Sequence, residues 1–99
     1  MILGRVIGTV WSTRKDENLV GSKFLIVRHL NVDYTPKDST VVAVDSVGAG
    51  VGEIVLVAQG SSARQTDITK NKPVDAVIMA IVDKLDIVVK EQSKDMVKN

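Results

Sequence analysis

Residues 41–64 read VVAVDSVGAGVGEIVLVAQGSSAR, and this stretch decides the fold class of the chain. Two runs within it, residues 41–44 and 54–57, are rich in β-branched side chains, which favour strands because they pack well on a pleated surface. A connector with glycine at every second position, residues 48–52, separates the runs, and a turn at residues 60–64 closes the stretch. The pattern predicts strand, loop, strand and turn, with glycines that supply positive φ or close backbone approach.

The glycine connector invites comparison with a phosphate-binding loop. The dinucleotide motif is G-x-G-x-x-G between a strand and a helix, whereas Gly48, Gly50 and Gly52 alternate and the chain continues as a strand. A Walker loop would end in Gly-Lys-Ser or Gly-Lys-Thr, which the connector lacks. The spacing argues against phosphate binding, so the connector is expected to set backbone shape rather than to hold a cofactor.

Composition narrows the function classes. The 99 residues suit one domain with a modest core, and a small β-rich chain with such a core is expected to bury more surface against copies of itself. The chain contains no cysteine, so neither disulfides nor thiolate metal sites are expected, and the cytosol is the default compartment. A net charge of +1 is not the excess of positive charge that indicates binding to nucleic acid or to an anionic membrane. The longest apolar run, residues 76–82, is far shorter than the ~20 residues that span a bilayer, and residues 1–5 do not resemble a signal peptide.

Five strands are predicted along the chain. They are residues 1–13, 23–30, 40–47, 53–58 and 77–89. The last is ambiguous, because its apolar residues also fit helical spacing, but eight of the sixteen residues in 74–89 are Val or Ile, which favours a strand. Ser61 or Ser62 is expected to N-cap a short helical turn. The sequence therefore predicts a mainly all-β fold, a small OB-like β-barrel of about five strands with one short helical turn.

The remaining segments are expected to be turns, a loop and a tail. Residues 14–21 are polar and turn-like, and residues 31–39 form a loop with Pro36 as a breaker. Simple alternation puts Gly4 and Gly8 on one face of the first strand, together with Val6, where two glycines indicate a sharp bend or a close backbone approach. Residues 1–90 are expected to form the single domain, and residues 91–99 a charged, flexible tail.

No side-chain constellation predicts catalysis, a cofactor or a metal. His29 is the only histidine, and with no cysteine beside it the several ligands of a metal site are missing. Asp75, Asp83 and Asp86 are too far apart or on different faces of the expected strand to share a proton. They are expected to be solvated or to form hydrogen bonds between subunits.

Arg64 is the polar residue that the turn at residues 60–64 singles out. Its planar guanidinium can bind carboxylates or backbone carbonyls at an interface, and the alternative is an arginine exposed to solvent. Ser61 and Ser62 have no histidine nearby in the sequence, so a Ser-His-Asp triad has no support.

The barrel fold itself raises one alternative function, a binding module for single-stranded nucleic acid. Such sites combine aromatic stacking platforms with a basic groove. This chain has Trp11, Phe24 and Tyr34 as its only aromatic residues, on separate elements, and no excess of positive charge. Nucleic-acid binding is therefore kept only as the alternative.

Several segments, in the same order, resemble the bacterial microcompartment vertex proteins, the pentameric shell family of ethanolamine-utilisation and carboxysome shells. The matching segments are residues 8–15, 19–25, 42–56, 60–64 and 73–83. The resemblance implies an OB-like barrel that forms a homopentamer, caps a vertex of a polyhedral shell built mostly of hexameric shell proteins, and has no catalytic activity. It also implies a place in the microcompartment shell, within the bacterial cytoplasm.

The connector and the turn are the candidate site. A ring has a heterologous interface, so each subunit contributes two different surfaces, and the small residues here would let neighbouring backbones pack closely. The residues expected to shape these loops or to lie at a subunit interface are Gly48, Ala49, Gly50, Gly52, Glu53, Gly60, Ser61, Ser62, Ala63 and Arg64.

Overall fold

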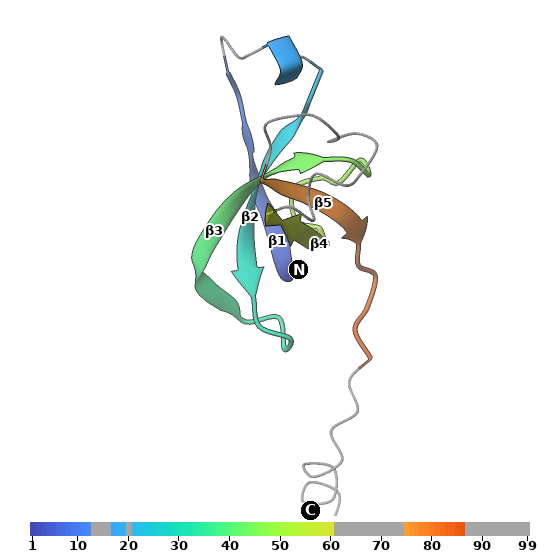
Figure 1. Cartoon of the computed structure of the whole chain (residues 1–99). Coiled ribbons are helices and arrows are strands. Elements are labelled where there is room, and N and C mark those ends of the chain that lie inside the picture. Colours follow the sequence, from blue (N-terminus) through green and yellow to red (C-terminus); the bar gives the residue numbers. More distant parts are fainter. Residues whose placement is uncertain (13–16, 20, 61–74, 87–99) are drawn as a thin grey trace, which may run out of the picture.

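The chain folds into a closed five-stranded β-barrel. The computed structural model describes residues 1–12, 17–19, 21–60 and 75–86 (Figure 1). The elements are β1 (Ile2–Val10), the 3-10 helix η1 (Glu17–Leu19), β2 (Phe24–Leu30), β3 (Pro36–Asp45), β4 (Ile54–Gln59) and β5 (Ala76–Ile81). Around the barrel the strands follow the order β1-β2-β3-β5-β4, which confirms the predicted small all-β barrel. Within the described ranges, no helix has the length and apolar character needed to cross a membrane.

The barrel is closed unevenly. β1 pairs with β2 and β4, β2 pairs with β3, and β4 pairs with β5, all in antiparallel ladders. β3 and β5 form the single parallel contact of the barrel, and it consists only of the pairs Val44–Val77 and Asp45–Ile78. Counting only the described residues, most of β3 therefore has a strand on one side.

A β-bulge divides β1 into two parts. Val6 lies opposite Val27 and Gly8 lies opposite Ile26, so Ile7 is the extra residue. An extra residue reverses the alternation of faces beyond it. The prediction that Gly4, Val6 and Gly8 share one face is therefore wrong, and Ile7 is 47% exposed on the outside of the barrel.

The two glycines of β1 differ in how closely they approach β2. A Cβ atom on Gly4 would collide with Cγ1 of Val27 and lie 2.8 Å from the carbonyl oxygen of Arg28. This confirms the predicted close approach at Gly4. A Cβ atom on Gly8 would meet Cδ1 of Ile26 at 3.5 Å, which is an ordinary contact. Gly8 therefore lies beside the bulge but not against another backbone.

Small aliphatic side chains fill the barrel. Alternate residues of β2 point inward, so Leu25 and Val27 are fully buried while Ile26 between them is only partly covered. The buried core residues are Val6, Leu25, Val27, Ala43, Ala49, Val55, Val57, Ala76 and Ile78. A smaller cluster of Val44, Ala58 and Val77 packs with Phe24. The core thus draws on all five strands and on one residue of the glycine connector.

β3 begins earlier than the sequence predicts. The expected loop at 31–39 ends in the structure at Pro36, which pairs with Leu30. A tight turn brings the two together, because Asn31 N donates to Thr35 O at 2.8 Å and Tyr34 adopts a φ of 72°. Proline is tolerated as the first residue of a strand, where it need not donate to the ladder, so Pro36 opens the strand rather than breaking it.

Two other boundaries differ from the prediction. β1 ends at Val10, short of the predicted residue 13, and β5 ends at Ile81 rather than at residue 89. Val82 N still donates to Ile54 O at 2.8 Å, but residues 82–86 form no strand. The helix η1 falls in the predicted polar turn, whereas the helical turn expected at Ser61 or Ser62 and the tail at 91–99 lie outside the described residues.

Candidate functional site

One carboxylate organises the glycine loop, which we define as residues 46–53 between β3 and β4. Asp45 Oδ1 accepts hydrogen bonds from the backbone N–H groups of Val47, Gly48 and Ala49, at 3.1, 3.1 and 3.2 Å. The side chain of Asp45 is only 5% exposed. A carboxylate that accepts several backbone donors is a strong local constraint, because hydrogen bonds to ionised groups are stronger than neutral ones. Asp45 therefore fixes the first half of the glycine loop.

Two further side chains anchor the same half of the loop to the strands. Lys23 Nζ, just before β2, donates to the carbonyl oxygen of Ala49 at 3.1 Å and lies 3.9 Å from Asp45 Oδ2. Ser46 Oγ donates to the carbonyl oxygen of Ile78 in β5. The loop is thereby tied to both β2 and β5.

The second half of the glycine loop is held against β1. Gly52 N donates to Val6 O at 2.8 Å, and Val6 N donates to Glu53 O at 2.9 Å. Arg5 Nη1 donates to Gly52 O at 2.9 Å. Glu53 also closes the turn on itself, because its Oε1 accepts from Gly50 N at 2.6 Å while its N–H donates to Gly50 O at 3.1 Å.

The three glycines of the loop serve different purposes. Gly48 and Gly52 have φ values of 78° and 95°, in the left-handed region that other residues rarely adopt. Of the two predicted uses of the connector glycines, positive φ or close backbone approach, these two positions show positive φ. Gly50 has no positive φ, and a Cβ atom there would meet Glu53 Oε1 at an ordinary 3.6 Å. The backbone freedom expected of Gly50 is therefore not used.

Ala49 is the buried residue of the glycine loop. It has no exposed surface and belongs to the barrel core. Val51, two residues on, is 65% exposed, and Val47 is 39% exposed. The loop thus places one small side chain inside the barrel and presents two apolar side chains to its surroundings.

The second candidate segment is only partly described. Gly60 has a φ of 68°, and its N–H donates to Asp75 O at 2.8 Å. This contact joins the end of β4 to the start of β5. Ser61, Ser62, Ala63 and Arg64 lie outside the described residues.

The other polar residues considered for chemistry do not converge. His29 Nδ1 lies 2.8 Å from Ser39 Oγ, and its Nε2 is buried without a hydrogen-bond partner among the described residues. Asp75, Asp83 and Asp86 are all exposed. Over the part of the chain that the structure describes, no group of three or more acidic, histidine or cysteine side chains is placed to hold a metal ion.

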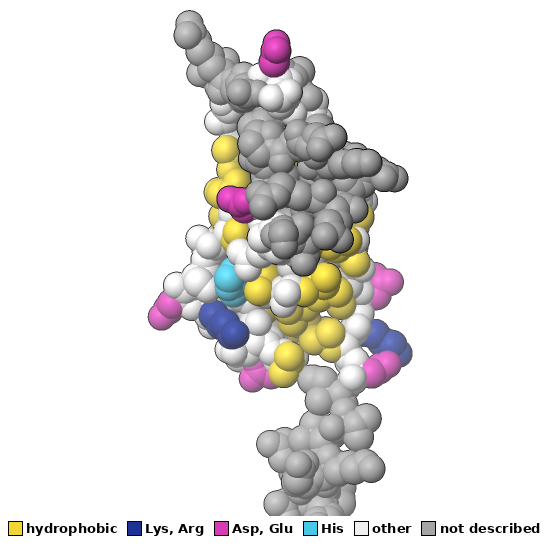
Figure 2. All heavy atoms as spheres, viewed as in Figure 1, with side chains coloured by type: hydrophobic (Ala, Val, Ile, Leu, Met, Phe, Trp, Pro, Cys, Tyr) yellow, Lys and Arg dark blue, Asp and Glu magenta, His cyan; other side chains and the backbone are white. Residues whose placement is uncertain are grey.

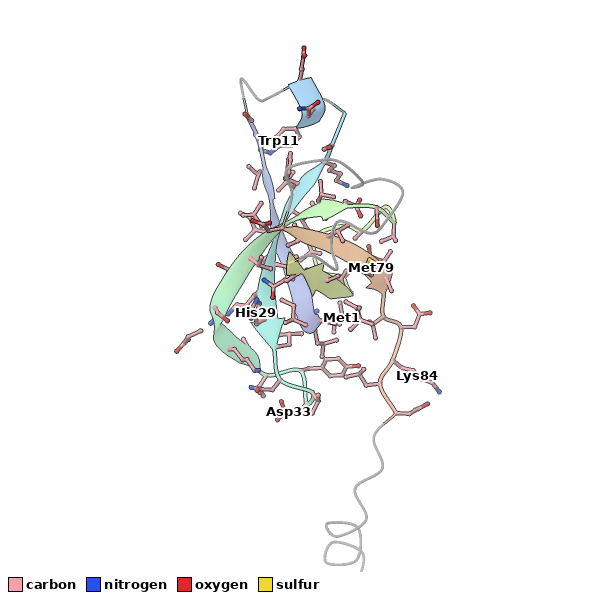
Figure 3. All side chains as sticks on the ribbon, viewed as in Figure 1. Met1, Trp11, His29, Asp33, Met79 and Lys84 are labelled. Atoms are coloured by element: carbon pink, nitrogen blue, oxygen red, sulfur yellow. The ribbon has the colours of Figure 1, made fainter. Side chains whose placement is uncertain are left out.

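Apolar side chains are exposed at both ends of the molecule. Trp11, just beyond β1, is 89% exposed, and Figure 3 places it at the end opposite Asp33. The lower part of the face in Figure 2 carries a broad group of hydrophobic side chains. A groove of about 430 Å³ lies among apolar residues that include Met1, Leu30, Leu56 and Leu85. We call it the base groove.

The aromatic residues do not form a stacking platform for nucleic acid. Phe24 packs against the smaller cluster of Val44, Ala58 and Val77. Tyr34 lies in the turn between β2 and β3. Trp11 lies at the other end of the molecule from Asp33, a neighbour of Tyr34 in that turn (Figure 3). Stacking of successive bases needs neighbouring aromatic faces, so the geometry does not favour the nucleic-acid alternative.

Sequence reasoning identified the glycines of this site but missed the side chains that hold them. Asp45, Lys23 and Arg5 were not predicted to have a role. A signal for Asp45 was present, because an aspartate just before a Ser-Val-Gly sequence is typical of a side chain that caps the following turn. No local signal indicates Lys23 or Arg5, since their partners are 26 and 47 residues away in the chain.

The fold and site define a small β-barrel with a shape-determining loop. The family described as "Ethanolamine utilisation protein EutN/carboxysome" matches residues 1–83. The chain belongs to this family, which confirms the resemblance seen in the sequence. GrpN of Rhodospirillum rubrum, a bacterial microcompartment shell vertex protein, is 51% identical over 88 residues, or 89% of this chain and 99% of GrpN. PduN of Salmonella typhimurium, also a shell vertex protein, is 47% identical over 86% of this chain and 98% of PduN.

Solved structures agree with the sequence relatives. The structure described as "GrpN pentameric microcompartment shell protein from Rhodospirillum rubrum" has a TM-score of 0.81 and 51% identity, and covers 89% of this chain and 100% of that chain. The structure of CcmL from Gloeobacter violaceus has a TM-score of 0.83 and 42% identity, and covers 88% of this chain and 90% of that chain. The barrel described above is thus the fold of shell vertex proteins.

Proposed function

We propose that the chain is a structural shell protein whose homopentameric ring caps the vertices of a polyhedral bacterial microcompartment. The observation that carries this proposal is the 51% identity, over 89% of this chain, to a protein whose solved structure is described as a pentameric shell protein. The relatives are shell vertex proteins rather than enzymes, so the role is structural. Its place is the shell of a microcompartment in the bacterial cytoplasm.

The exposed apolar surface supports assembly. Ile7, Trp11, Val42 and Val51 are between 47% and 89% exposed, on β1, just beyond it, on β3 and in the glycine loop. Large apolar side chains at several places on a small chain are typical of surfaces that other proteins cover. A ring needs two different contact surfaces on each subunit, and apolar residues on different sides of the barrel meet that need.

The candidate residues divide into two roles under this proposal. Gly48, Ala49, Gly50, Gly52 and Glu53 shape the glycine loop, because Ala49 fills the core and the others form the turn around it. Gly60 begins the second turn. The neighbouring subunit is contacted by the four residues that follow, Ser61, Ser62, Ala63 and Arg64. The Arg64 guanidinium is the hydrogen-bond donor in this contact.

The outer partners of the ring are hexameric shell proteins. The relatives are named for the vertex, and a vertex protein of a polyhedron is surrounded by the proteins of the facets. A mixture of this chain with hexameric shell proteins should give closed particles, and omission of the chain should leave open or irregular assemblies in electron micrographs.

The mass in solution tests the proposal most directly. Native mass spectrometry should give five times the chain mass of 10.7 kDa. The Arg64→Ala variant should dissociate at a higher concentration than the unchanged chain, and Lys84→Ala, on an exposed side chain outside the candidate site, serves as the control. A stable monomer at micromolar concentration would refute the ring. A salt-dependent gel shift with an oligonucleotide would instead support the nucleic-acid alternative.

A further inference from the structure

The base groove lies at one end of the barrel and is built from many parts of the chain. Its lining comes from the first four strands and from the segment after β5, at Ile2, Leu30, Lys37, Leu56 and Leu85. Figure 3 places Met1 and His29, which also line it, in the same half of the molecule. Its volume of about 430 Å³ falls within the roughly 300–1,000 Å³ of small-molecule sites, which often lie in the mouths of β-barrels. The groove is therefore large enough for a small ligand.

The lining of the base groove combines aliphatic residues with two basic ones. Figure 2 shows His29, the only histidine of the chain, at the edge of the broad group of hydrophobic side chains. Lys37 belongs to the same side of the groove, because Arg28 Nε, one residue before His29, donates to Lys37 O at 2.9 Å. Over the described part of the chain, no acidic residue lines the groove. The groove thus has one basic side and an apolar remainder.

His29 has a hydrogen-bonding atom that the barrel does not use. Its Nδ1 lies 2.8 Å from Ser39 Oγ, whereas its Nε2 is buried and has no partner among the described residues. A buried polar atom without a partner costs free energy, and a ligand that supplies the partner removes this cost. An acceptor atom on a ligand would select the tautomer in which Nδ1 accepts from the Ser39 hydroxyl and Nε2 carries the proton.

Lys37 supplies a positive charge beside this histidine. Its ammonium forms no ion pair with another described residue, whereas the neighbouring carboxylates have partners. Asp38 Oδ1 lies 3.6 Å from Arg28 Nη2, and Asp33 Oδ1 accepts from both the hydroxyl and the N–H of Thr35. An ammonium next to an unpaired imidazole nitrogen suits an anion, because hydrogen bonds to an ionised group are the stronger ones.

We propose that the base groove binds a small aliphatic monocarboxylate. The carboxylate lies between the Lys37 ammonium and His29 Nε2, and the alkyl chain lies against the leucine side chains of the groove. Because Nε2 is buried, the side chains that cover it move aside as the carboxylate enters. Burial of the alkyl chain supplies affinity, while the two basic groups fix the orientation of the ligand.

The proposed ligand site is separate from the glycine loop. No residue of that loop lines the base groove. The loop is held by Asp45, Lys23 and Arg5, none of which lines the groove either. The inference therefore adds ligand binding to the proposed structural role and does not depend on how many copies assemble.

Octanoate is the probe for this site, and the full-length chain is titrated with it in a calorimeter. Octanoate joins a carboxylate to an apolar chain, whereas acetate lacks the chain and 1-octanol lacks the charge. We expect saturable binding of octanoate, with shifts in the methyl NMR signals of Leu30 and Leu56, and at least about tenfold weaker binding of both other compounds. The proposal is overturned if octanoate does not bind at millimolar concentration, or if 1-octanol binds as tightly.

Two lysine variants test the position of the carboxylate. Lys37→Met keeps the apolar stem and removes the ammonium, so it should weaken octanoate binding about tenfold or more. Lys84→Met is the matched control, because Lys84 is exposed and does not line the groove, and it should leave the affinity unchanged. An unchanged affinity in Lys37→Met, or an equal loss in both variants, would refute the site.

The role of His29 is tested by His29→Phe, which keeps a planar ring and removes both nitrogens. Octanoate binding should again weaken about tenfold, and an unchanged affinity in a folded variant would contradict the assigned contact. Circular dichroism shows whether the variant is folded. If it is not, the ¹⁵N NMR signal of Nε2 in the unchanged chain decides, because octanoate should shift it and acetate should not.

The two proposals fail in different ways. A chain that is monomeric by native mass spectrometry but binds octanoate refutes the proposed ring alone. A pentamer that does not bind octanoate refutes the ligand site alone.

Discussion

The Asp45 carboxylate should contribute more to stability than any other single polar side chain of the glycine loop. We predict that Asp45→Ala lowers the free energy of unfolding by about 2–4 kcal/mol, because hydrogen bonds to a charged group are worth about 1.5–3 kcal/mol each and these three share one oxygen. The expected loss is smaller than that of three independent hydrogen bonds, because Val47 and Gly48 are exposed and water can replace part of the lost hydrogen bonding.

The ion pair with Lys23 adds little to this value. Its two charged atoms are 3.9 Å apart and the Lys23 side chain is 53% exposed, so screening by solvent limits the pair to about 0–1 kcal/mol. The Lys23→Met variant keeps an apolar stem but loses both the ion pair and the hydrogen bond to Ala49 O, so it is the comparison and should cost about 1–2 kcal/mol. Asp45→Asn keeps one carbonyl oxygen as an acceptor, so its loss in the free energy of unfolding should lie between those of Asp45→Ala and Lys23→Met.

Urea unfolding followed by circular dichroism measures these differences. All variants must be compared at one protein concentration, because assembly adds to apparent stability by mass action. A loss of about 2–4 kcal/mol corresponds to a melting temperature lower by roughly 10–25 °C for a domain of this size. If Asp45→Ala loses less than Lys23→Met, the three backbone hydrogen bonds do not hold the loop and the reasoning is wrong.

Three further changes test other features of the structure. Gly4→Ala should cost about 1–3 kcal/mol in urea unfolding, because the added Cβ meets neighbouring atoms of β2, and a neutral result would contradict the close approach. Gly52→Ala should lower the free energy of unfolding by about 1–2 kcal/mol because Gly52 has a positive φ, whereas Gly50→Ala should be nearly neutral. Equal losses in the two variants would show that the positive φ of Gly52 is not the cause. A hydrogen bond from the Thr35 hydroxyl, followed by one from its N–H, lowers the pKa of Asp33 below the ordinary 3.8. The contribution of Asp33 is therefore present above the unfolded pKa and lost as pH falls through the lower folded pKa, and Thr35→Val should raise the NMR titration midpoint.

The glycine loop and β3 differ in how many neighbouring elements hold them. The loop is held by β1, by β5, by Lys23 just before β2 and by a buried alanine, which suits a part whose shape must not vary. Among the described residues, most of β3 pairs with a strand on one side only.

The sequence by itself determined the elements of this protein. β-branched runs placed four of the five strands to within a few residues, because pleated surfaces favour those side chains wherever they fold. The glycine pattern predicted positive φ or close backbone approach in the connector, and Gly48 and Gly52 adopt a positive φ. Family motifs supplied the assembly that composition alone only suggested.

The tertiary structure decided what depends on distant partners. The bulge at Ile7 follows from how β1 pairs with β2, and the early start of β3 follows from the turn that brings Pro36 to Leu30. β5 ends at Ile81 because its ladder with β4 ends there, although the β-branched pattern continues for eight more residues. Asp45 holds the glycine loop through local bonds, but Lys23, just before β2, and Arg5, in β1, reach it from far away in the sequence. Local preference selects the conformation of a segment, while pairing across the barrel fixes where that segment begins, bends and stops.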